Sequence, residues 1–225
     1  MGKILIPADS PDDWQRFLAE PEKQWKTGYS ARSMAYCWQE ADGIPTDLVA
    51  VLEQAPAFSG IETLLVIPEH KVPLPGGSRS SQNDAWVLAR ANGELISIAV
   101  EGKVSEPFGP SLKKWDSNSS AGKKERFEYL CSILDFDSKP ADDIRYQLLH
   151  RTASAIIEAQ RFNAKSAVML VHSFSQTEEW FSDYESFLSL FGVEAKPNSV
   201  VSAGERSGVA LYFAWVRGDK KYLLA

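Results

Sequence analysis

The spacing of apolar residues changes along the chain and predicts its helices and strands. Apolar residues three and four positions apart predict helices, and this spacing marks residues 31–41, 126–134, 142–162 and 178–190. Continuous apolar or β-branched runs predict strands, and such runs mark residues 61–67, 84–91, 94–101, 165–174 and 209–216. The order of these segments is typical of an α/β protein with a mixed sheet flanked by helices.

Local signals predict where several elements begin and end. Helix starts are expected at Ser10, at Ser30 as the cap of the helix 31–41, and at Thr46 for a short helix that runs to residue 53. Pro68 is expected to end a buried strand, and a further short strand is expected over residues 3–6. The Pro- and Gly-rich residues 71–81 and the turn-rich residues 104–122 are predicted to be loops, the second of them mobile.

The predicted order over residues 31–174 is helix, three strands, helix and strand. A long helical connection back to a strand permits parallel pairing of the strands it joins. We expect one domain over residues 1–225, with this core and with additions over 1–30 and 175–225.

The dipeptide Asn92-Gly93 fixes the register of one predicted hairpin. This pair favours a two-residue turn, so Ala91 faces Glu94 across it, and counting back along both strands places Asp84 opposite Glu101. Lys103 lies two residues beyond Glu101 and therefore shares its face. The hairpin is thus expected to bring two carboxylates and one ammonium group together.

An acidic residue two positions before a lysine occurs five times, at Glu69, Glu101, Asp137, Glu194 and Asp219. Only Glu101 has a second carboxylate predicted opposite it. Directly opposed side chains on an antiparallel pair are roughly 5 Å apart, which lets two carboxylates share one Mg²⁺ or Mn²⁺ ion while the lysine positions a water molecule. The alternative is a solvent-exposed cross-strand ion pair with little energetic consequence.

With Asp84, Glu101, Gly102 and Lys103 in this arrangement, the chain resembles the PD-(D/E)xK, or restriction-endonuclease-like, nuclease superfamily. The resemblance implies a restriction-endonuclease-like core over residues 31–174 and hydrolysis of phosphodiester bonds. It implies that Asp84, Glu101 and the backbone carbonyl of Gly102 hold the metal and that Lys103 is catalytic. The chain departs from the pattern at Asn83, where the superfamily often has proline.

The resemblance also implies contributions from neighbouring elements. Members often add a polar residue from the following helix, where this chain offers Gln147 as a catalytic group and His150 and Arg151 as substrate-binding groups on the same helical face. A solvent-facing polar stripe is the alternative. Glu40 or Glu53 could supply a further acidic ligand, although solvated charges on a helix surface are favoured for both.

Composition limits the partners that this chain can bind. The net charge of −6 argues against indiscriminate nucleic-acid binding, so any contact must be local. Candidate contacts are Arg79 before the hairpin and Lys113 and Lys114 in a basic stretch. The Arg79 segment is equally consistent with a plain surface loop, and a solvated loop is favoured for the basic stretch. We expect a nucleic-acid partner, with DNA ahead of RNA, and by analogy a possible homodimer.

The sequence lacks the motifs of acyl hydrolases, P-loop NTPases, Rossmann dehydrogenases and zincins. Its two cysteines, Cys37 and Cys131, have no metal-ligand spacing and are predicted to be small buried hydrophobes. Without a long apolar run, the protein is expected to be cytoplasmic and not to enter a membrane. The rival hypothesis is a non-catalytic binding protein that keeps a nuclease-like fold.

Overall fold

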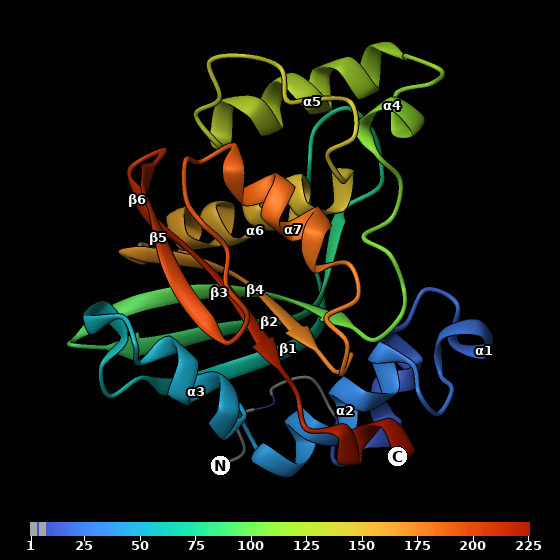
Figure 1. Ribbon diagram of the computed structural model, residues 1–225, viewed down its shortest axis with the longest axis vertical. Helices are drawn as coiled ribbons and strands as arrows, with labels where there is room; N and C mark the ends of the chain where they lie inside the picture. The colour runs from blue at the N-terminus through green and yellow to red at the C-terminus, as the bar shows by residue number, and fades with distance from the viewer. Residues whose placement is uncertain (1–3, 5–7) are drawn as a thin grey trace.

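The computed structural model describes residue 4 and residues 8–225, and it consists of one six-stranded sheet between two layers of helices (Figure 1). The helices α6 and α7 cover one face, and α2 and α3 cover the other. The strands are β1 (Glu62–Val72), β2 (Ser81–Ala91), β3 (Glu94–Lys103), β4 (Ser166–Ser173), β5 (Ser199–Arg206) and β6 (Val209–Arg217). The α-helices are α1 (Pro21–Gln24), α2 (Ser30–Ala41), α3 (Thr46–Leu52), α4 (Leu112–Trp115), α5 (Ala121–Ile133), α6 (Tyr146–Phe162) and α7 (Phe181–Ser189). Short 3-10 helices span η1 (Pro11–Phe17), η2 (Pro56–Phe58) and η3 (Lys220–Leu224).

The sheet has the strand order β1-β2-β3-β4-β6-β5 and is mixed, which confirms the α/β prediction. Antiparallel pairs join β1 to β2, β2 to β3, and β5 to β6, whereas β3, β4 and β6 run parallel. The helix α6 connects β3 to its parallel neighbour β4, as the long helical segment predicted. Such a connection brings the first turns of α6 to the carboxyl end of β3.

Alternate residues of the central strands pack into two separate cores. Every residue of β4 is buried, with Met169 and Val171 facing α6 and α7, and Val168 and Leu170 facing α2 and α3. A strand that is buried on both faces accounts for the continuous apolar run in its sequence.

The predicted hairpin register is confirmed. Asn92 and Gly93 both have positive φ, at 53° and 82°, as the tight turn requires. Ala91 pairs with Glu94, and the pairing continues without a shift to Ala85 and Val100. The next position along both strands brings Asp84 alongside Glu101.

The first predicted strand differs from the structure. Pro68 does not end β1, which continues to Val72, and the loop begins at residue 73. Since β1 is an edge strand, the missing N–H of a proline need not interrupt the ladder. For the same reason the strand is only partly buried, and the prediction of a buried strand was wrong.

Several element boundaries also differ. The helix α6 begins at Tyr146 rather than at residue 142, and residues 104–122 include the short helix α4. Ser30 is the first residue of α2 rather than its cap, because its N–H and hydroxyl donate to Glu106. The predicted helix after Ser10 is a 3-10 helix.

The structure also differs from the prediction at one edge strand and near the N-terminus. The exposed edge strand β5 was not predicted, because its sequence alternates weakly. The expected strand 3–6 lies outside the described residues except for Ile4, which forms a parallel bridge with Val66. Among the described residues, no helix combines the length and apolar character needed to cross a bilayer.

Candidate functional site

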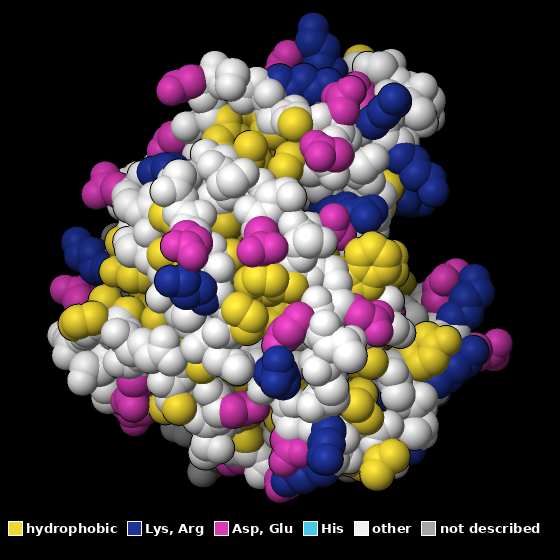
Figure 2. All heavy atoms as spheres, in the orientation of Figure 1, with side chains coloured by type: hydrophobic (Ala, Val, Ile, Leu, Met, Phe, Trp, Pro, Cys, Tyr) yellow, Lys and Arg dark blue, Asp and Glu magenta, His cyan; other side chains and the backbone are white. Residues whose placement is uncertain are grey.

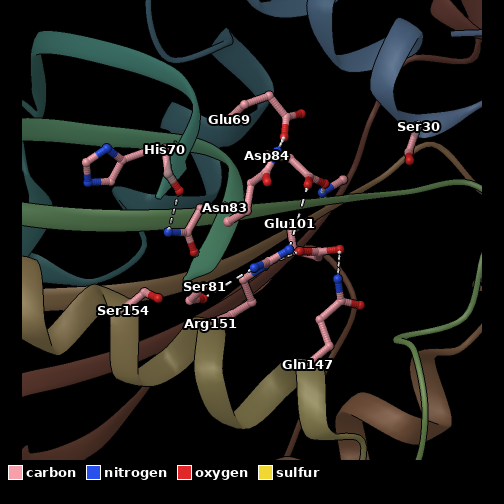
Figure 3. A network of polar contacts seen from close by, with 12 residues as sticks. Ser30, Glu69, His70, Ser81, Asn83, Asp84, Glu101, Gln147, Arg151 and Ser154 are labelled. Atoms are coloured by element: carbon pink, nitrogen blue, oxygen red, sulfur yellow. Dashed lines mark hydrogen bonds and ion pairs between the residues drawn. The ribbon is translucent and has the colours of Figure 1, made fainter. Parts of the chain in front are cut away.

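The three residues predicted on the hairpin face α6 and line a cavity of about 380 Å³ at the carboxyl end of β3. Asp84 and Glu101 project from adjacent strands toward the first turns of α6, from which Gln147 and Arg151 reach back (Figure 3). The Asp84 side chain is 23% exposed, and that of Glu101 is 2% exposed. The cavity therefore admits solvent on the Asp84 side.

Glu101 is the centre of the polar network. Its Oε1 accepts hydrogen bonds from Nζ of Lys103 at 2.6 Å and from Nε2 of Gln147 at 2.7 Å, and its Oε2 accepts one from Nε of Arg151 at 2.5 Å. Burial alone would raise the pKa of Glu101, but the charges of Arg151 and Lys103 outweigh it and lower that pKa. Glu101 is therefore an ionised carboxylate held between two cations.

Asp84 has a different environment from its neighbour. Burial, followed by the charge of Glu101, raises the pKa of Asp84 to about 7. Its Oδ2 accepts a hydrogen bond from the backbone N–H of Gly102 at 2.7 Å, and its Oδ1 lies 4.0 Å from Nη2 of Arg151. Lys103 and Arg151 both hydrogen-bond to Glu101. The Asp84 carboxylate can therefore accept a further positively charged partner.

A side chain at position 102 would point toward α2 and not into the cavity. A Cβ atom at this position would lie 2.3 Å from Sδ of Met34 and 3.3 Å from Oδ2 of Asp84. The close approach of α2 therefore requires glycine between Glu101 and Lys103. Its N–H at the same time fixes the rotamer of Asp84.

Glu69 is a third carboxylate in this cavity, and its place was not predicted from the sequence. On β1, Pro68 pairs with Ala85 and His70 pairs with Asn83, so Glu69 lies across from Asp84 with a φ of 51°. Burial, and then the charge of Asp84, raises the pKa of Glu69 well above its usual value. Three adjacent strands thus carry a row of three acidic side chains.

The helix α6 supplies the groups that the resemblance implied. Gln147 and Arg151 both bond to Glu101. His150 faces Ser81 instead, with its Nδ1 2.7 Å from Oγ of that serine. Gln147 and Arg151 therefore line the carboxylate cavity together, as predicted. His150 does not join them and lines a neighbouring cavity instead.

Other predicted residues lie away from the carboxylates. Arg79 is exposed and lines the same neighbouring cavity as His150, and Lys113 and Lys114 are exposed on α4. Glu40 pairs with Lys221 at 2.8 Å, and Glu53 accepts a hydrogen bond from the N–H of Gly60. The suggested extra acidic ligand from a helix is therefore wrong, since neither Glu40 nor Glu53 lines the cavity.

The cavity offers part of the donor set that a divalent cation requires. Carboxylate and carbonyl oxygens are the ligands that Mg²⁺ and Mn²⁺ prefer, and Asp84 and Glu101 supply such oxygens on one face. Across the part of the chain that the structure describes, however, no three His, Cys, Asp or Glu side chains lie close enough together to hold a metal ion. Glu101 already accepts three hydrogen bonds, which leaves one of its four lone-pair positions, on Oε2, for an ion.

A family model matches residues 7–220 of this chain, which is nearly all of it. The chain belongs to DUF6946, a domain of unknown function. No curated protein and no solved structure matches this DUF6946 member.

Proposed function

We propose that this protein is a metal-dependent phosphodiesterase that cleaves nucleic acid through a PD-(D/E)xK-like site. The observation that carries the proposal is the convergence of Asp84, Glu101 and Lys103 in one cavity, together with Gln147 and Arg151 from α6. Buried carboxylates with opposed pKa shifts in a solvent-accessible cavity are typical of functional sites.

Each side chain has a role in this proposal. A bound Mg²⁺ or Mn²⁺, held by Asp84, Glu101 and the carbonyl of Gly102, would polarise a phosphate oxygen and activate water. Lys103 holds the attacking water and offsets charge that develops on the phosphate. Arg151 and Gln147 orient Glu101, because they fix both of its oxygens.

The architecture supports the same proposal. Apart from the inserted helices α3, α4 and α5, the order α2, β1, β2, β3, α6, β4, with β3 and β4 parallel, is compatible with the helix, three strands, helix and strand of a restriction-endonuclease-like core. The acidic residue lies on the second strand and the Glu101-Gly102-Lys103 triplet on the third. This likeness of element order bears on the fold, whereas the side chains of the cavity bear on the activity.

Local positive charge could attract a polyanion despite the net charge of −6. Figure 2 shows Lys and Arg side chains, mixed with Asp and Glu, over the α4–α5 end of the molecule and again over the α1 end, on either side of a notch in its outline. Lys23 of α1 lines the carboxylate cavity, and Lys113 and Lys114 are exposed on α4. Local positive charge of this kind attracts phosphates where the whole protein would not.

The test is cleavage of labelled single- and double-stranded DNA and RNA with Mg²⁺ or Mn²⁺, combined with calorimetric titration of Mn²⁺. Wild-type protein is expected to bind the ion and to cut at least one substrate, with DNA expected ahead of RNA. Asp84→Asn, Glu101→Gln and Lys103→Met are each expected to lower the rate at least about 100-fold.

The matched control is Glu194→Gln. Glu194 belongs to the same kind of acidic-x-Lys triplet, but it is exposed and its pair with Lys196, at 3.7 Å, lies outside the cavity. This variant should cleave as the wild type does. Wild-type protein that cuts none of the substrates, or cleavage that persists in Asp84→Asn, would contradict the proposal.

A non-catalytic binding protein is the second candidate, and one observation favours it. Both oxygens of Glu101 are already bonded, to Lys103, Gln147 and Arg151, and the side chain is 2% exposed. If this network is purely structural, Mn²⁺ should produce no heat in the titration, and nucleic acid or protein binding should be identical in wild type and Asp84→Asn.

A further inference from the structure

A second cavity, of about 270 Å³, lies beside the carboxylate cavity and differs from it in charge. Its lining residues are Leu74, Arg79, Ser80, Ser81, Pro110, Trp115, Arg126, Tyr146 and His150. Two arginines are among them, and none of these described residues is an Asp or a Glu. The carboxylate cavity, by contrast, is lined by four acidic side chains.

Arg126 is a buried cation whose side chain hydrogen-bonds to neutral acceptors. Its Nε donates to the carbonyl of Pro75 at 2.8 Å, and its Nη2 donates to the carbonyls of Leu74 and Gly77, both at 3.3 Å. Within the described part of the chain, no carboxylate lies within ion-pair distance of Arg126. A buried charge without a counterion attracts an anion, because carbonyl dipoles offset only part of its charge.

His150 adds a neutral imidazole ring to the same wall. Burial, and then the charges of Arg151 and Arg126, holds the pKa of His150 well below its usual value. Nη1 of Arg151 lies 3.5 Å from Nδ1 of His150 and 3.3 Å from Oγ of Ser81. Nδ1 also lies 2.7 Å from Oγ of Ser81, which can accept a proton from it or donate one to it, and the ring offers a donor to an anion when its proton is on Nε2.

The position of this cavity relates it to the carboxylates. Ser81 lines it and also bonds to Arg151, which in turn bonds to Glu101, so the two cavities share one wall (Figure 3). Ser81 and Asp84 are three residues apart on β2, which is about 10 Å along an extended strand. That separation is within one or two nucleotides along an extended single strand.

We propose that this second cavity is a phosphate subsite, in which Arg79, Arg126 and His150 bind a phosphate group of a nucleotide close to the bond that is cleaved. Arginine forms forked hydrogen bonds with phosphate oxygens, and Arg79 is the exposed group that can close over the anion. The anion site stands on its own residues, whereas its role as a substrate subsite rests on the proposed nuclease function.

The first experiment measures binding without catalysis. Thymidine 5′-monophosphate, inorganic phosphate and thymidine are titrated into the full-length protein in low salt with EDTA, and into its Asp84→Asn variant. Both proteins are expected to bind the two phosphates but not the nucleoside. Arg79→Gln should weaken phosphate binding by about tenfold, and Arg79→Lys by less.

The control for net charge is Arg90→Gln, at the opposite end of β2, where Arg90 pairs with Glu62 at the surface. It should bind phosphate as the wild type does. Failure of the wild type to bind either phosphate would overturn the proposal. Equal weakening in Arg79→Gln and Arg90→Gln would also overturn it, because only the general charge of the protein would then be at work.

The second experiment tests the link to cleavage. If the subsite binds substrate, Arg79→Gln raises KM for an oligonucleotide severalfold and leaves kcat unchanged, since Arg79 does not touch the carboxylates. Phosphate binding in a protein that cleaves nothing would uphold the anion site and refute the nuclease. Cleavage with a KM that is unaffected by Arg79→Gln would uphold the nuclease and refute the subsite.

Discussion

Nε of Arg151 lies 2.5 Å from Oε2 of Glu101, and both side chains are buried. Taking two charges out of water is costly, so such a pair contributes little net stability while it is intact. Removal of Arg151 leaves Lys103 as the one cation bonded to Glu101 and takes away the hydrogen bond to Oε2, which destabilises the fold because a buried charged group then lacks a partner. The structure of the cavity therefore depends on Arg151 whether or not the protein is an enzyme.

Arg151→Met is accordingly expected to lower the free energy of unfolding by about 2 kcal/mol, measured by urea denaturation. The comparison is Arg90→Met, which breaks the 2.7 Å pair with Glu62 at the surface and should cost less than about 1 kcal/mol. Equal costs for the two variants would show that the Arg151–Glu101 pair is no more important than a surface pair.

The raised pKa of Asp84 predicts how stability depends on pH in metal-free protein. The unfolded chain releases the Asp84 proton near pH 4, whereas the folded protein keeps it until about pH 7. The ionised Glu101 faces this carboxyl with like charge, and Arg151 and Lys103 only partly oppose it, while the neighbouring Glu69 has a raised pKa of its own. Stability from this group is therefore complete below pH 4 and is lost as the pH rises to about 7.

Asp84→Asn removes this dependence. The variant should be more stable than the wild type at pH 8, by on the order of 2 kcal/mol, and the difference should shrink toward pH 4. Urea midpoints at several pH values in EDTA measure it, with the exposed Asp137→Asn as control. Parallel curves for wild type and Asp84→Asn would mean that Asp84 titrates as an ordinary surface carboxyl.

The core of the site could be predicted because its register is set locally. A two-residue Asn92-Gly93 turn leaves one way to pair the flanking strands, and strand alternation then assigns faces to Asp84, Glu101 and Lys103. The start of α6 was predicted at residue 142 instead of Tyr146, but this error did not change the predicted face of Gln147 and Arg151. Residues four apart share a helical face wherever the helix begins.

Glu69 could not be predicted in the same way. The strands β1 and β2 are joined by residues 73–80, which form no tight turn, so nothing local fixes their register. Glu69 also has a left-handed backbone conformation within its strand, with a φ of 51°. The strand β1 tolerates this irregularity because it lies at the edge of the sheet. Its edge position follows from the order of all the strands, which the spacing of apolar residues does not predict.

Gly102 provides a test of how closely α2 and β3 approach. Gly102→Ala places a methyl group 2.3 Å from Sδ and 2.9 Å from Cγ of Met34, a buried side chain that has to find another rotamer in a packed core. Overpacking of this kind is expected to cost about 1–3 kcal/mol by urea denaturation.

A double-mutant cycle with Met34→Ala checks the cause. The shorter side chain removes the clash, so the double variant should be more stable than the sum of the single costs predicts, by at least about 1 kcal/mol. Costs that simply add would place the effect of Gly102→Ala elsewhere, for instance in the backbone at Asp84.

The two cysteines are expected to differ in reactivity because their burial differs. Cys37 is 3% exposed, and burial, followed by the charge of Asp47, raises the pKa of its thiol to about 12. Cys131 is partly exposed, and burial raises its pKa less far. Since the thiolate is the reacting form, a chromogenic disulfide reagent at pH 8 should modify Cys131 in the folded protein while Cys37 reacts only after unfolding.

The control variants identify which cysteine reacts. Cys131→Ser should abolish the fast phase of the reaction, and Cys37→Ser should leave it intact. A fast phase that survives Cys131→Ser would show that the layer of α2 over the sheet opens far more readily than its packing implies.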